Sequence, residues 1–195
     1  RLNRAIAEHR TVQMRYFTAS RNVTTRREVD PYHLRYVGGA LYLIAYDHRR
    51  REVRLFAVDR IRALTPTDHP YQMPLGFDVN TYMQDALGVM RGRPIEVELL
   101  FSKPTAAWVR ERIWHPTQHF TRLKDRRLRM TLTVAHTPEL VGWVLRFGSG
   151  VRVVRPPVLR EQVRGEARKI FRGTTDQTMT VRPRLRKSSS KARQG

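Results

Sequence analysis

The sequence predicts an α+β protein in which a small β-barrel precedes a second module of mixed strands and helices. Five short strand-like segments joined by tight turns fall within residues 10–64, a pattern typical of a small closed or nearly closed barrel. After residue 94 the segments follow the order β-α-β-β-α-β, the ferredoxin-like split βαβ pattern, with one further helix. A chain of 195 residues is long enough for two small cores.

The first module begins with a change of hydrophobic period. Apolar residues recur at helical spacing within residues 1–9, which predicts the last turns of a helix. Val12, Met14 and Tyr16 then alternate with polar residues, as on a half-buried strand, and the polar residues 20–25 form a turn.

Four more strands complete the predicted barrel. Pro31 interrupts the second strand and indicates an edge position or a bulge, because proline cannot donate to a ladder. Gly38 and Gly39 are typical of a hairpin turn. The predicted strands cover residues 26–36, 41–46, 52–58 and 60–64.

The second module is expected after a connector. Residues 65–76 are rich in proline, histidine and aspartate and indicate a loop, and residues 77–87 a short helix. Pro104 is placed to start one helix, and Thr137 to cap another that runs through Phe147. The predicted elements are a strand at 95–101, a helix at 104–114, a hairpin at 118–123 and 128–135, a helix from 138, a strand at 151–154 and a helix at 158–171.

The expected domain boundaries follow from these elements. They are a linker helix end at 1–9, a barrel at 10–75, a connector at 76–93, a second domain at 94–172 and a tail at 173–195. The tail lacks apolar periodicity and carries serines among lysines and arginines, so we expect it to be disordered. It could touch nucleic acid nonspecifically, or be a solvated tail without a role.

Net charge is the most informative bulk property. Lys and Arg number 38 against 17 Asp and Glu, a net of +21, of which +5 falls in residues 173–195 and +16 in the remainder. Such an excess favours polyanions through phosphate neutralisation and counterion release. The alternative is an arginine-rich codon bias that places solvated cations wherever they are tolerated.

Several classes of protein are disfavoured. The absence of cysteine excludes disulfides and thiolate chemistry, and no apolar run approaches membrane-spanning length, so we expect a cytoplasmic protein without membrane association. His115 and His119 lie four residues apart, but Pro116 disfavours a continuous helix through both, and no nearby carboxylate completes a metal site. Without a phosphate loop or a nucleophile elbow, we expect no enzyme, no cofactor and no metal.

Three spaced segments resemble the WYL domain. They are Asp30-Pro31-Tyr32-His33-Leu34, Gly39 to Tyr46, and Arg54 to Ile61. Leu41 stands where the family's tryptophan would be, while Tyr42 and Leu43 are retained. The module after residue 94 resembles the C-terminal extension, WCX, that often follows WYL domains.

This resemblance implies a fold and a function. WYL domains adopt an Sm-like or SH3-like barrel and usually follow a winged helix-turn-helix in bacterial transcriptional regulators. Because the chain begins at Arg1 rather than Met, we expect that DNA-reading part to be missing here. The implied partners are a single-stranded nucleic acid or nucleotide effector, promoter DNA through the missing domain, and a second copy in a homodimer.

The candidate binding residues lie on the strands of the first module. Tyr42 faces away from Leu41 and Leu43, so it is either free to stack a base or packed with its hydroxyl satisfied. Arg54 and Phe56 share a strand face and could clamp a phosphate and stack a base, although Phe56 alone is more often a core residue.

The remaining candidates have weaker support. Arg60 follows Asp59 and could form only an exposed ion pair, but the family's basic pocket favours a binding role for it. The others could line the same pocket or be ordinary surface residues: His33, Arg35, Tyr16, and Arg27 with its neighbour Arg26.

Three functions remain open at this stage. The first is the effector-sensing and dimerisation region of a transcriptional regulator. The second is a nucleic-acid-binding accessory module that modulates a partner enzyme, which the absence of an upstream helix-turn-helix would favour. The third is a hydrolase, which turnover of oligonucleotides would reveal.

Overall fold

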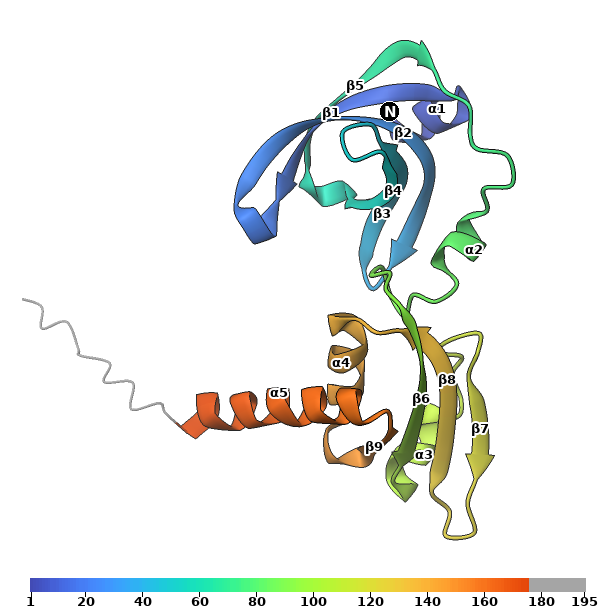
Figure 1. Ribbon diagram of the computed structural model, residues 1–195, viewed down its shortest axis with the longest axis vertical. Helices are drawn as coiled ribbons and strands as arrows, with labels where there is room; N and C mark the ends of the chain where they lie inside the picture. Colours follow the sequence, from blue (N-terminus) through green and yellow to red (C-terminus); the bar gives the residue numbers. More distant parts are fainter. Residues whose placement is uncertain (176–195) are drawn as a thin grey trace, which may run out of the picture.

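The computed structural model describes residues 1–175, which fold as two modules joined by a connecting segment, residues 71–93 (Figure 1). Each module has its own hydrophobic core. None of the helices in residues 1–175 is long and apolar enough to cross a membrane. Most of the predicted tail, residues 176–195, lies outside the described residues, whereas 173–175 belong to the last helix.

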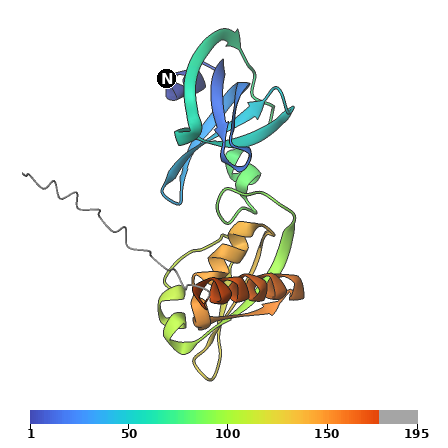
Figure 2. The same cartoon turned by 90° about the vertical axis from the view of Figure 1, so that its left-hand side faces the viewer.

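The first module is one curved antiparallel sheet with the strand order β4-β3-β2-β1-β5 (Figures 1 and 2). Its core contains buried residues of β1 to β4 and Ala5 of α1. The elements are α1 Leu2–Ala7, β1 Arg10–Thr18, η1 Ala19–Arg21, β2 Val23–Val37, β3 Ala40–Asp47, β4 Glu52–Ala57, η2 Val58–Arg60 and β5 Ile61–Pro70.

The sheet does not close into a barrel, so the expectation of a closed barrel is corrected. Among the described residues β4 and β5 form no ladder with each other. The 3₁₀ turn Val58–Arg60 separates the two strands, and the chain then pairs β5 with the free edge of β1, beginning at Tyr16 and Ile61.

Pro31 produces the bulge that the sequence predicted. The β2–β3 register shifts between Pro31 and His33, and Tyr32 is the extra residue. The edge alternative is wrong because β2 lies between β1 and β3. Pairing with β1 ends at Val29, so the missing N–H of Pro31 costs no bond on that side.

Strand β5 is longer than the sequence predicted. Residues 65–70, expected to be a loop, continue the ladder with β1 as far as the pair Arg10–Pro70. The Thr67 hydroxyl donates to the Thr11 carbonyl at 2.8 Å and holds the strand there. Edge pairing therefore overrides a loop-like composition.

The second module is a four-stranded antiparallel sheet of order β7-β8-β6-β9. Its core is built mainly from one face of this sheet together with α3, α4 and Leu159 of α5. The elements are β6 Pro94–Phe101, α3 Lys103–Val109, β7 His119–Arg122, β8 Leu128–Ala135, α4 Pro138–Leu145, η3 Gly148–Gly150, β9 Val151–Arg155 and α5 Pro157–Thr175, and α2 Val79–Met83 lies in the connecting segment.

Helix α3 ends earlier than expected. Trp114, predicted to be helical, lies beyond the helix, and its indole N–H donates to the Val109 carbonyl at 2.9 Å. Its ring packs against the rings of Trp108, Trp143 and Phe147. This aromatic cluster and the bond to Val109 outweigh continued helical spacing.

Candidate functional site

The candidate residues that the sequence suggested lie on two different faces of the first sheet. Strand registers place one set on the face that carries the core, here called the core face: Tyr16, Arg27, Arg54 and Phe56. They place another set on the opposite, outer face: His33, Arg35 and Tyr42. The structure therefore does not gather them into one pocket.

Tyr16 and Phe56 are part of the core. Their exposed fractions are 8% and 3%, and their rings meet edge to face with centroids 5.1 Å apart. The Tyr16 hydroxyl accepts the Ala57 N–H at 3.2 Å. Neither ring is available to stack a base in this arrangement.

Arg27 forms a buried ion pair. Its guanidinium donates to the Asp47 carboxylate at 2.8 Å, and the side chains are only 6% and 0% exposed. A second bond runs from Nε of Arg27 to the Thr25 hydroxyl at 3.1 Å. These contacts give Arg27 a structural role, because either charge left alone would be costly to bury.

Of the other arginines of the predicted site, Arg54 and Arg60 are exposed and Arg35 is half-buried. Arg54 donates to Glu52 at 2.6 Å, an exposed pair that contributes little stability. Arg60 lies in η2, and its side chain forms no ion pair or hydrogen bond within the part of the chain that the structure describes. On the outer face, Arg35 is directly opposite Tyr42, whose other neighbour, Ala57, precedes η2.

A different set of cations meets on the outer face of β1, β2 and β5. Arg15 and Arg26 are direct cross-strand partners, and Ala63 lies opposite Arg15 on the other side. We call this feature the arginine hollow, a depression of about 600 Å³. It is lined by Gln13, Met14, Arg15, Arg26, Arg27, Glu28, Ala63 and Thr65.

The arginine hollow has an excess of positive charge. Like charges directly opposite one another destabilise a sheet, yet within residues 1–175 the side chains of Arg15 and Arg26 form no hydrogen bond or ion pair. The acidic lining residue, Glu28, lies 3.9 Å from His69. An anion bound between the two guanidinium groups would remove their repulsion.

The next cross-strand pair on the same face of β1 and β2 contains an aromatic ring. Phe17 is opposite Thr24, next to the Arg15–Arg26 pair, and the Arg62 guanidinium lies 5.4 Å from the Phe17 ring centroid. An arginine over a ring offers both a charge and a stacking surface.

Arg15 is not among the candidates that the sequence suggested, and Arg26 is among them only as a neighbour of Arg27. Both residues alternate with core positions on consecutive strands, which is visible in the sequence. That they face each other depends on the β1–β2 register, which follows the short turn ending at Asn22 in the left-handed region, φ +51°.

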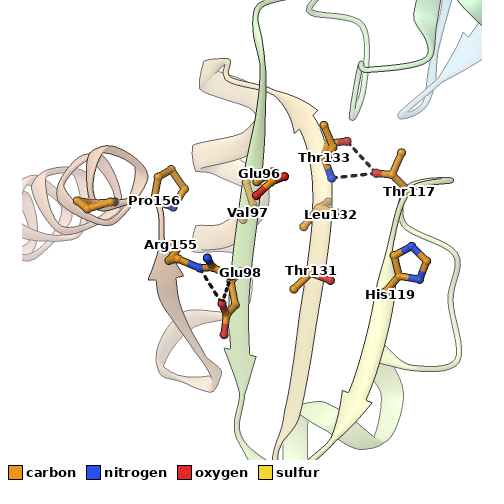
Figure 3. A pocket seen from close by; sticks show the side chains of 11 residues that line it. Glu96, Val97, Glu98, Thr117, His119, Thr131, Leu132, Thr133, Arg155 and Pro156 are labelled. Atoms are coloured by element: carbon orange, nitrogen blue, oxygen red, sulfur yellow. Dashed lines mark hydrogen bonds and ion pairs between the residues drawn. The ribbon is translucent and has the colours of Figure 1, made fainter.

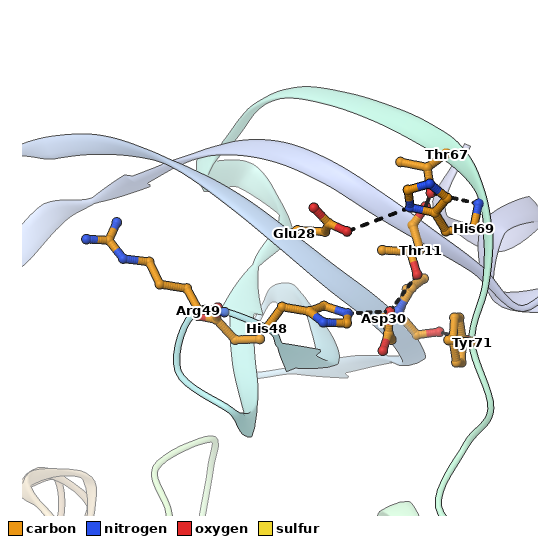
Figure 4. Close-up of polar contacts among 10 residues, drawn as sticks. Thr11, Glu28, Asp30, His48, Arg49, Thr67, His69 and Tyr71 are labelled. Atoms are coloured by element: carbon orange, nitrogen blue, oxygen red, sulfur yellow. Dashed lines mark hydrogen bonds and ion pairs between the residues drawn. The ribbon is translucent and has the colours of Figure 1, made fainter.

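A polar cluster around Asp30 connects the first module to the connecting segment (Figure 4). The buried Asp30 carboxylate accepts the Thr11 hydroxyl at 2.7 Å and lies 2.8 Å from Nε2 of His48. The Tyr71 hydroxyl donates to the Pro31 carbonyl. Burial, with the charge of Asp30, raises the pKa of Tyr71 to about 12, so this phenol stays a donor.

The uncovered face of the second sheet is hollowed, but its central charge is satisfied (Figure 3). Glu98 accepts from Arg155 at 2.7 Å and lies 3.2 Å from Arg129. The Thr117 hydroxyl donates to the Thr133 carbonyl and accepts the Thr133 N–H. These bonds stabilise the sheet.

The two histidines considered for metal binding are not on one helix. His115 is 2% exposed in the loop after α3 and lies 2.8 Å from the Thr117 hydroxyl, whereas His119 is exposed on β7. Burial lowers the pKa of His115. Within residues 1–175 no three His, Cys, Asp or Glu side chains are placed to share a metal ion.

Comparison with known proteins identifies both modules. The WYL domain family matches residues 1–66, and the WCX domain family matches residues 93–171. Protein PafC of Mycobacterium tuberculosis is 29% identical over 170 residues, which cover 84% of this chain and 50% of PafC. YobV of Bacillus subtilis, an uncharacterized HTH-type transcriptional regulator, is 24% identical over 164 residues, covering 84% of this chain and 51% of YobV.

The chain thus spans about half the length of these relatives. A crystal structure of a CRISPR Cas-related protein has a similar fold, with a TM-score of 0.59 at 12% identity, over 89% of this chain and 51% of that one.

Proposed function

This chain belongs to the family of proteins that join a WYL domain to a WCX domain, and we propose that it is the effector-sensing and dimerisation region of a bacterial transcriptional regulator. The resemblance to the HTH-type regulator YobV supports a regulatory role. In this proposal a winged helix-turn-helix of the same regulator contacts promoter DNA. The first sheet would correspond to the Sm/SH3-like fold and the second to the ferredoxin-like one.

The effector we propose is a single-stranded nucleic-acid fragment or a nucleotide. The observation that carries this proposal is the facing pair Arg15–Arg26, whose side chains form no hydrogen bond or ion pair among the described residues. A phosphate accepts hydrogen bonds from two guanidinium groups at once, and Phe17 with Arg62 supplies an adjacent surface for a base. Arg35 and Tyr42, on the same outer face, would extend the contact to a longer strand.

Binding would act on DNA affinity through a shift in population. An effector changes the regulator only if it binds one arrangement of the homodimer more tightly than the other. A tenfold difference in affinity between the two arrangements corresponds to about 1.4 kcal/mol. The effector site and the dimer contacts must therefore be coupled within this chain.

The test is titration of short labelled single-stranded DNA and RNA against the wild-type chain and two sets of variants. Arg15→Gln and Arg26→Gln should each weaken binding about tenfold, since each removes a charge-assisted hydrogen-bond donor set. Arg54→Gln, which loses one exposed arginine on the other face, is the matched control and should bind like the wild type.

Repeating the titration at two salt concentrations separates the site from bulk charge. A loss of affinity equal in Arg54→Gln and Arg26→Gln would mean that any exposed cation serves, and the proposed site would be wrong. Binding lost only in Arg54→Gln would transfer the site to the surface around Arg54, one of the candidates that the sequence suggested.

A further inference from the structure

The second module carries a cationic depression of its own, far along the chain from the arginine hollow. We call it the basic hollow, about 280 Å³ in volume. It lies between α3 and the β7–β8 hairpin and is lined by Lys103, Ala106, Ala107, Arg110, Arg122, Arg126, Arg127 and Leu128.

One wall is a single stripe of α3. Residues 103, 106, 107 and 110 follow the i, i+3, i+4, i+7 spacing of one helix face. Lys103 and Arg110 lie at the two ends of this stripe. The two residues between them are alanines, whose short side chains leave the helix surface open. A ligand can therefore lie along the helix and meet a positive charge at each end.

The other wall is the β7–β8 hairpin. Arg122 is the last residue of β7, and Arg126 occupies the turn in the left-handed region, φ +66°. Tyrosine, phenylalanine and tryptophan are absent from the lining of the hollow. The site offers charge and donors without a surface on which a base could stack.

The positive charge of the basic hollow is largely uncompensated. Asp125 accepts from Nε and from the backbone N–H of Arg127, bonds that lower the pKa of Asp125 together with the charge of Lys103. Four exposed cations have no hydrogen bond or ion pair from their side chains within residues 1–175: Lys103, Arg110, Arg122 and Arg126.

We propose that the basic hollow binds the sugar-phosphate backbone of a nucleic-acid strand. Lys103 and Arg110 are seven residues apart, about 10 Å along the helix axis. A single phosphate would reach one end of this span only, whereas successive phosphates of one strand can contact both ends. The contact positions a strand and does not read its sequence, because no group in the hollow is placed to recognise a base.

The experiment uses the whole 195-residue chain and a labelled DNA duplex of unrelated sequence, titrated at several salt concentrations. The test variant is Lys103→Gln/Arg110→Gln/Arg126→Gln, and the matched control is Arg49→Gln/Arg50→Gln/Arg168→Gln, three exposed cations outside the hollow. The test variant should bind at least about tenfold more weakly, and its slope of log K against log salt should be shallower by about 0.9 for each lost contact.

Two results would overturn this inference. One is an equal change of slope in the control, which would mean that net charge alone drives binding. The other is unchanged DNA binding in the test variant combined with loss of its binding to anionic phosphatidylserine vesicles, which would assign the hollow to a lipid surface.

Two further variants test whether misfolding or the arginine hollow accounts for the result. If the triple variant does not fold, as judged by circular dichroism, Arg110→Gln alone should still make the slope shallower by about 0.9, and an unchanged slope contradicts the proposal. The same slope change should appear in a chain that already carries Arg15→Gln and Arg26→Gln, so failure of the effector site does not affect this result.

Discussion

Arg27 shows how the burial of one residue changes its role. Its pairing with the fully buried Asp47 makes it part of the first core rather than of a ligand surface. We predict that Arg27→Met lowers the free energy of unfolding by about 3–5 kcal/mol, because it leaves an uncompensated buried carboxylate. Urea unfolding followed by circular dichroism measures this loss.

Arg54→Met is the control for Arg27→Met, since it breaks an exposed pair and should cost less than about 1 kcal/mol. A loss below about 1 kcal/mol in Arg27→Met as well would show that Asp47 is not an isolated charge in the variant. Recovery of stability in Arg27→Met/Asp47→Asn would confirm the assignment.

Arg26 illustrates the opposite case, a residue whose position is unfavourable for the sheet alone. Because Arg15 faces it, Arg26→Thr should raise the free energy of unfolding by about 0.2–1 kcal/mol in the absence of an anion. The same change should weaken nucleotide binding. Thermal unfolding at low salt checks the stability, and a destabilised Arg26→Thr variant would contradict the repulsion that we infer.

His115 makes stability depend on pH. Burial lowers its pKa in the folded state below the ordinary value of 6.5, against opposing effects of the Gln84 backbone and Asp85. The unfolded state therefore binds more protons, so this stabilisation is present above about pH 6.5 and is lost as the pH falls toward the folded pKa. Urea midpoints of the wild type should fall between about pH 7.5 and about pH 5.

His115→Asn should have a weaker pH dependence over the same interval, while the exposed-residue control His119→Asn should keep the wild-type profile. Equal pH profiles for the wild type and His115→Asn would show that other groups carry the titration.

The connecting segment contacts both modules. On the first-module side, Tyr82 donates to the Val53 carbonyl at 2.6 Å and Tyr71 stacks on His9. On the second-module side, the Asp85 carbonyl accepts the Ala135 N–H at 2.7 Å. The Gln84 backbone also contacts His115 of the second module, so the change from one module to the other falls between Tyr82 and Gln84.

Glu139 holds the second half of the connecting segment. Its carboxylate accepts the backbone N–H groups of Val89 at 2.9 Å and Met90 at 2.8 Å. We predict that Glu139→Ala costs about 1–3 kcal/mol in unfolding free energy, because two charge-assisted bonds are lost. Hydrogen exchange at Val89 and Met90 should accelerate, whereas exchange in β8 should not.

The carboxylate of Glu161, which pairs with Arg164 on the exposed surface of α5, provides the comparison. If Glu161→Ala accelerates exchange at Val89 as much as Glu139→Ala does, the connecting segment is not held by Glu139.

At the scale of the whole molecule, charge repulsion is the dominant electrostatic property. A net charge of +21 on 195 residues favours expansion of the chain, and counterions reduce this effect. We predict that the melting temperature rises with sodium chloride and rises further with sulfate at equal ionic strength, because a divalent anion can bind the arginine pair. Differential scanning calorimetry measures both effects.

Removing the arginine pair should reduce the sulfate-specific part of that increase, while the part that arises because sulfate is excluded from the protein surface should remain. A sulfate effect that is unchanged in Arg15→Gln/Arg26→Gln would show that the arginine pair is not where the anion acts.

The sequence by itself was sufficient for the elements and their order. Helical spacing and strand alternation identified most strands and helices, Pro31 indicated the bulge, and paired glycines with φ of +56° and +87° form the expected hairpin. The resemblance of three short segments to the WYL domain agrees with the family match over residues 1–66. These features are local, or depend on spacing along one chain.

Only the tertiary structure decided which residues share a surface. Alternation shows that Tyr16 and Met14 lie on the same side of a strand, but it does not show which side becomes the core or which residue lies opposite on the next strand. The register between β1 and β2 places Arg15 against Arg26, and burial removes Tyr16, Phe56 and Arg27 from the ligand surface that the sequence suggested. Register and burial depend on contacts between distant segments, so the charge that predicted an anionic partner could not locate where that partner would bind.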